Sequence, residues 1–123
     1  MEKAHFIEHA GKKIFILDVS GCQPAEMSPL IEECARQIRS QPSKSVYSVT
    51  IATGGKFDAG VIEQFKRLTK GNEPHVIKSA VVGVTGMQQV ALMLISTFSN
   101  RTFEVCGDLE QAKRYIAADT SKP

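Results

Sequence analysis

The order of hydrophobic and polar positions predicts that strands and helices alternate along the chain. Short apolar runs bounded by turn residues are typical of strands, and they occur at residues 5–8, 13–18, 46–52, 77–84 and 102–106. The run Ile14–Val19 is almost continuously apolar, as expected of a strand that is covered on both faces. A glycine-bearing turn at residues 9–12 separates the first two runs and predicts a β-hairpin.

Apolar residues at helical spacing lie between the later strands. The first helix is predicted through Met27 to Ile38 and the second after Asp58, which can cap it. The third is predicted from Gly86 to about Ser99, opened by the capping-box pattern Thr85-x-x-Gln88, and the fourth runs from Asp108 to Ala118. The order β-β-α-β-α-β-α-β-α predicts an α/β fold: one domain over residues 1–123 with a mixed, mostly parallel five-stranded sheet.

The third predicted helix is unusually apolar. One broad face carries its main apolar stripe, while Leu92 and Met93 lie off the centre of that face on either side; the stripe comprises Met87, Val90, Ala91, Leu94, Ile95 and Phe98. A surface helix usually keeps such flanking positions polar. Leu92 and Met93 therefore either pack under neighbouring elements or form an apolar ligand site or a dimer surface. A homodimer is the more economical contact, because a two-fold axis buries the same patch twice.

A glycine-bearing loop connects the predicted strand 46–52 to the second helix. In open α/β sheets this corner is where ligands and partners usually dock. The sequence Thr53-Gly54-Gly55-Lys56-Phe57 does not match a phosphate-binding loop, since Thr50 and Phe57 stand where that motif needs glycine and a hydroxyl. The glycines either permit a sharp turn or contribute, with Lys56, to a weaker anion site. The candidate partner- or anion-binding corner comprises Thr53, Gly54, Gly55, Lys56, Asp58 and Gly60.

Charge and hydropathy exclude several classes of function. The 15 basic and 13 acidic residues are scattered, so no stripe for binding nucleic acid is expected. The run Val90–Ile95 is too short to span a membrane, and the first residues lack the apolar segment of a signal peptide. We therefore expect a cytoplasmic protein with reduced thiols.

Catalytic and metal-binding patterns are not found in the sequence. Cys22, Cys34 and Cys106 are far apart and show no metal-ligand spacing, so neither a metal nor another cofactor is expected. Cys106 precedes a predicted helix start, where a thiolate would be favoured; alternatively it is a small residue that ends a strand. Because no acid–base pair or nucleophile elbow is evident, an enzyme is not expected.

Three segments in their order, Lys12–Gly21, Ser79–Val84 and Phe103–Ala112, resemble the STAS domain family. The resemblance spans residues 5–119 and is greatest to the SpoIIAA-like branch of small stand-alone bacterial proteins. It implies a regulatory or protein-interaction module rather than a catalyst, with structural kinship to lipid-binding domains of the CRAL-TRIO type.

Anti-sigma-factor antagonists of that family carry Asp-Ser-Ser-Gly at the start of the second helix, and a kinase phosphorylates the second serine. The matching residues here are Phe57, Asp58, Ala59 and Gly60, so Ala59 stands at the acceptor position and has no hydroxyl. Asp58 is then either an N-cap or a mimic of the phosphate. We expect a non-catalytic regulatory module without the phosphoacceptor and with an unknown protein partner. The alternative is a carrier of a small apolar or lipid-like ligand, which an elongated cavity beside Leu92 or Met93 would support.

Overall fold

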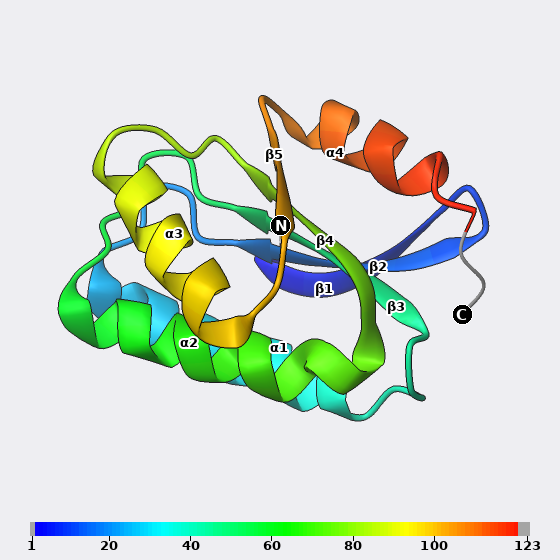
Figure 1. Ribbon diagram of the computed structural model, residues 1–123, viewed down its shortest axis with the longest axis horizontal. Coiled ribbons are helices and arrows are strands. Elements are labelled where there is room, and N and C mark those ends of the chain that lie inside the picture. The colour runs from blue at the N-terminus through cyan, green and yellow to red at the C-terminus, as the bar shows by residue number, and fades with distance from the viewer. Residues whose placement is uncertain (1, 121–123) are drawn as a thin grey trace.

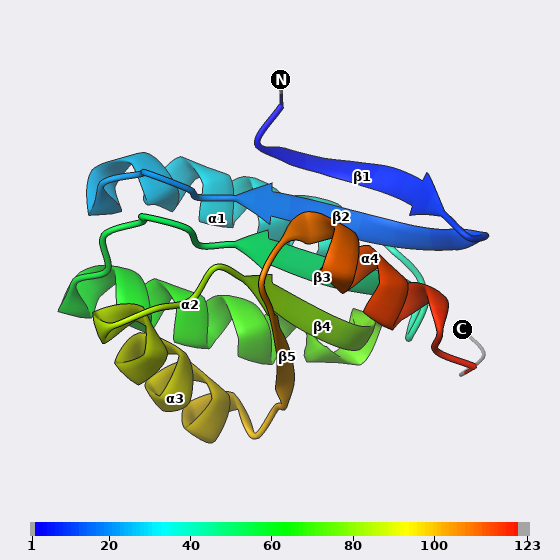
Figure 2. The ribbon, with the colours of Figure 1, turned by 90° about the horizontal axis from the view of Figure 1, so that it is seen from above.

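A single mixed β-sheet forms the centre of the computed structural model, which describes residues 2–120. Its strands follow the order β1-β2-β3-β4-β5 (Figure 2), with β1 antiparallel to β2 and the other strands parallel to β2. Ala10 and Gly11, in the hairpin turn, both have positive φ, as a type I′ turn requires. The strands are β1 (Ala4–His9), β2 (Lys12–Asp18), β3 (Val46–Ile51), β4 (Val76–Val82) and β5 (Phe103–Cys106).

Helices cover both faces of this sheet. Three of them lie side by side on one face, and α4 lies on the other (Figure 1). The predicted α/β fold with a five-stranded mixed sheet is confirmed, and each strand bound agrees with the expected one to within two residues. The helices are α1 (Pro24–Arg39), α2 (Ala59–Asn72), the short 3-10 helix η1 (Glu73–His75), α3 (Met87–Ser99) and α4 (Leu109–Ala117).

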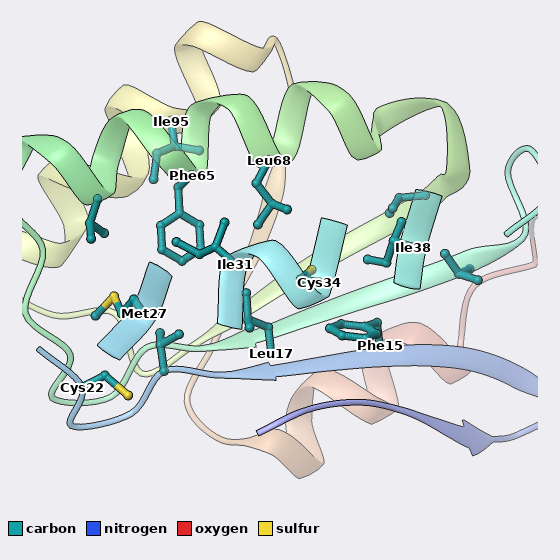
Figure 3. Close-up of a cluster of buried hydrophobic side chains, with 14 residues drawn as sticks. Phe15, Leu17, Cys22, Met27, Ile31, Cys34, Ile38, Phe65, Leu68 and Ile95 are labelled. Carbon is teal, nitrogen blue, oxygen red and sulfur yellow. The ribbon is translucent and has the colours of Figure 1, made fainter. Parts of the chain in front are cut away.

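Two hydrophobic clusters hold the layers together. Side chains alternate between the faces along β2, so Phe15 and Leu17 pack under α1 and α2 (Figure 3), while Ile14 packs toward α4. All of residues 14–17 are buried, which confirms that β2 is covered on both faces. Cys34, in α1, also belongs to the first cluster.

Helix α3 packs against α2 through only part of its apolar stripe. Ala91 and Ile95 are buried, and Ile95 lies beside Phe65 of α2 (Figure 3). The rest of the apolar stripe, which includes Met87 and Leu94, is exposed, so the stripe as a whole is not the buried side of α3. The side that faces the sheet and α2 instead consists of Gln88, Ala91, Leu92 and Ile95, which follow each other at helical spacing. The small side chain of Ala91 allows close approach, and Gln88 forms hydrogen bonds with the carbonyl oxygens of Ala52 and Gly55.

Candidate functional site

The corner at residues 53–60 lies at the carboxyl ends of the parallel strands, between β3 and α2. Asp58 caps α2, as predicted: its Oδ1 accepts a hydrogen bond from the Val61 N–H at 2.8 Å. Gly55 is buried, whereas the other predicted corner residues are exposed: Thr53, Gly54, Lys56, Asp58 and Gly60. The structure thus presents one side of this loop to solvent and fixes its other side.

Neighbouring loops hold the corner in place. The Gly21 N–H donates to the Thr53 carbonyl and the Lys56 N–H donates to the Cys22 carbonyl, both at 2.9 Å. Gly83, after β4, has a φ of +74°, and a Cβ there would lie 2.0 Å from Thr53 Oγ1. A side chain at position 83 is therefore incompatible with this packing. The loops that follow β2, β3 and β4 consequently form one connected surface.

Gln88 joins the corner to α3, a role that sequence reasoning missed. Its Nε2 donates to the carbonyl oxygens of Ala52 and Gly55, each at 2.8 Å. Its Oε1 accepts from the Thr85 N–H at 3.1 Å, so half of the expected capping box forms, although Gly86 is the N-cap. The first turn of α3 is therefore tied to the β3–α2 loop.

The corner's backbone is poorly suited to cradle an anion. The Gly55 N–H donates to the Ala52 carbonyl at 2.9 Å, and the Lys56 N–H is engaged as described. The carboxylate of Asp58 already occupies the N-terminus of α2, where a bound anion would gain most. An anion would have to displace these hydrogen bonds and approach a negative charge. The Lys56 side chain is exposed and has no ion-pair partner within residues 2–120.

One side of α3 presents a row of exposed apolar side chains, here called the α3 face: Met87, Val90, Met93, Leu94 and Phe98. Their exposed fractions run from 43% for Leu94 to 80% for Met87, and α3 contains no charged residue. A shallow hollow lined by Gly54, Lys56 and Met87 connects this face to the corner. Exposed apolar surface of this extent on one element is typical of an interaction site.

Leu92 and Met93 have different environments. Leu92 is half-buried, packs against Ala52, Val81 and Val84, and lines a cavity of about 50 Å³ between the sheet, α2 and α3. A space of that size accommodates a few water molecules at about 10–15 Å³ each, not a lipid. Met93 is 58% exposed. Leu92 thus packs partly against the chain's own core, whereas contact of Leu92 or Met93 with a ligand or a second copy of the chain stays a prediction.

An open groove of about 410 Å³ runs between α3 and β5, on the outer side of Leu92. Its apolar lining comes from Val84, Leu92, Met93, Phe103 and Val105, and Arg101 contributes the cation. Arg101 follows α3 directly, and its guanidinium carbon lies 5.2 Å from the centroid of the Phe103 ring. Burial lowers the pKa of Arg101, an effect that the charge of Glu73 partly opposes. Sequence reasoning did not identify Arg101 as a site residue.

Cys34 and Cys106 lie in environments that suppress the thiolate. Burial raises the pKa of Cys34 to about 12. Burial, together with the charges of Glu104 and Asp108, also raises the pKa of Cys106. This favours the interpretation of Cys106 as a small residue at the end of a strand.

Within residues 2–120 no cluster of His, Cys, Asp and Glu is arranged to bind a metal ion. Nor does any helix in that part of the chain have the length and apolar character needed to cross a membrane.

Comparison of the chain with protein-family models, curated proteins and solved structures finds no match. The resemblance to STAS domains therefore stays a prediction that rests on the segments quoted above.

Proposed function

We propose that the chain is a non-catalytic protein-interaction module of regulatory type, and that its docking surface is the α3 face together with the adjoining corner. The single observation that carries the proposal is the exposure of Met87, Val90, Met93, Leu94 and Phe98 on one helix. A partner that covered these side chains would gain a binding free energy of about 25 cal/mol for each Å² of apolar surface removed from water.

The first occupant that we propose for the α3 face is a second copy of the chain. A two-fold axis brings a residue close to its own counterpart, so a charge near the axis would face a like charge. Helix α3 has no charged residue among its 13 residues. Lys66 and Lys70 of α2 lie over the Phe98 ring, 5.4 and 5.2 Å from its centroid, and would form the polar rim of the contact. Homodimer interfaces combine an apolar centre and a polar rim in this way.

The corner would then be the site for a different protein partner. Its exposed residues are fixed by three loops and by Gln88, so they can present one conformation without a large ordering cost. Its opposite charges, Lys56 and Asp58, suit a mixed polar protein surface. The proposed relation to STAS domains agrees with this location, and Ala59 implies binding that does not depend on phosphorylation.

Sedimentation equilibrium of the purified chain and of glutamate variants tests the proposal. The wild-type protein should sediment as a dimer. Met87→Glu and Leu94→Glu should be monomeric at the same concentration, because an unpaired charge in a contact costs several kcal/mol and so weakens association by about 100-fold or more. Gln89→Glu adds the same charge to the same helix outside the α3 face, and it should remain dimeric.

Circular dichroism must show that all the variants keep the wild-type fold. A wild-type protein that is monomeric at every concentration would contradict the proposed homodimer. Dimerisation of Met87→Glu and Leu94→Glu with wild-type affinity would show that the α3 face is not the contact.

A further inference from the structure

We propose that the groove between α3 and β5 binds the hydrocarbon chain of a small amphipathic carboxylate, whose head group pairs with Arg101. The groove lies beside Leu92 and is separate from the hollow at the corner, so the inference does not depend on the docking function proposed above.

The cation at this site has no counter-ion. Within residues 2–120 no Asp or Glu oxygen lies within 4.0 Å of the Arg101 nitrogens. Glu73, whose charge acts on Arg101, pairs with Lys44 at 3.5 Å. A partly buried guanidinium loses hydration, and a carboxylate that it can bind in a bidentate manner is its best compensation.

The guanidinium is held in position but keeps donors free. Its Nη1 donates to the Thr69 carbonyl of α2 at 3.1 Å, and its Nη2 donates to Ser79 Oγ of β4. Ser79 Oγ is also 2.8 Å from Ser48 Oγ, in a hydroxyl pair inside the sheet. An arginine side chain has five N–H donors, and these two contacts leave others available. The cation is therefore oriented by α2 and β4 before any ligand arrives.

The space beside Arg101 has the size and polarity of an amphiphile site. The groove volume of about 410 Å³ falls within the range of about 300–1,000 Å³ that is usual for small-ligand sites. Leu92, Val84 and Phe103 line both the groove and the 50 Å³ cavity behind it. Arg101 also lines a second small void, of about 30 Å³, under α2.

Isothermal titration calorimetry with decanoate as the probe tests the inference, and decyltrimethylammonium serves as the matched cationic amphiphile. Decanoate should bind saturably with one site per chain, and the cationic probe should bind at least about tenfold more weakly. Arg101→Met keeps an unbranched apolar stem but removes the guanidinium, and it should lower decanoate affinity at least about tenfold. Arg114→Met, the same change at an exposed arginine of α4, should bind decanoate as the wild type does.

Because Arg101 also contacts α2 and β4, Arg101→Met could fail to fold. Val105→Glu provides a second test, since Val105 is 52% exposed, lines the groove and makes none of these hydrogen bonds. This variant should fold and should also lose decanoate affinity at least about tenfold. Absence of saturable decanoate binding, equal binding of the two amphiphiles, or wild-type affinity in Val105→Glu would each overturn the inference. Sedimentation equilibrium of the same proteins measures their oligomeric state and therefore tests the proposed dimer independently of ligand binding.

Discussion

Replacing Gln88 by alanine should loosen the junction between the corner and α3. The Gln88 side chain makes three hydrogen bonds, two to carbonyl oxygens in the β3–α2 loop and one from the Thr85 N–H. Gln89, the next residue, is exposed, and none of the side-chain hydrogen bonds within residues 2–120 involves it. Gln89→Ala is thus a matched control with the same change of composition and helix propensity.

The expected magnitude follows from what each partner loses. The Ala52 carbonyl keeps its bond from the Gly55 N–H at 2.9 Å, and the exposed Thr85 can turn to water. The carbonyl of buried Gly55 loses the Gln88 donor and keeps no other described partner. With about 0.5–1.5 kcal/mol for each hydrogen bond and an added cost for an unsatisfied buried group, Gln88→Ala should be about 1–3 kcal/mol less stable than Gln89→Ala.

Urea unfolding of the two variants at 25 °C, followed by circular dichroism, measures the difference. The transition midpoint of Gln88→Ala should fall while the slope of the free energy against urea stays unchanged, since the surface exposed on unfolding is the same. Equal free energies of unfolding for the two variants would refute the view that Gln88 joins α3 to the corner. The corner and the α3 face would then not form one rigid surface.

Three further outcomes follow from the same geometry. Asp58→Ala should lower the free energy of unfolding by about 0.5–2 kcal/mol in urea titrations, because it removes the N-cap of α2. Asp108→Ala should have the same effect at α4, where Asp108 Oδ1 accepts from the Gln111 N–H at 2.8 Å. Unchanged stability of Asp58→Ala with lost partner binding would instead assign Asp58 to the partner site. Cys34 and Cys106, whose pKa values burial raises, should react with an aromatic disulfide reagent at mildly alkaline pH only after urea unfolding, and rapid labelling of the native protein would contradict that burial. Met93→Glu should weaken both dimerisation and decanoate binding, because Met93 belongs to the α3 face and lines the groove; wild-type values in both sedimentation and calorimetry would exclude Met93 from both sites.

The fold was predictable because its signals are local. The continuous apolar run of β2 and the helical stripe of α1 each identify an element within a short window, and the alternation of such elements limits the topology. The cap by Asp58 was predictable for the same reason, since the hydrogen bond to the Val61 N–H spans three residues. The elements and their order therefore needed no long-range information.

The orientation of α3 and the roles of Gln88 and Arg101 required the structure. Periodicity indicates which residues share a face of a helix, but the partner decides which face turns inward. Here the contact of α3 with α2 selects the side of Ala91 and Ile95. Gln88 reaches Ala52, 36 positions away, and Arg101 reaches the Thr69 carbonyl, 32 positions away. The capping-box pattern predicted the contact of Gln88 with Thr85, but nothing near either residue in the sequence indicates these distant contacts.

Native mass spectrometry of the freshly purified protein tests the central claim most directly, because it reports subunit number and retained small molecules together. A binding module with an unpaired α3 face should appear as a species of twice the chain mass. Met87→Glu, which alters the most exposed residue of that face, should appear at the mass of one chain. A wild-type protein that is both monomeric and free of any bound molecule would contradict the account.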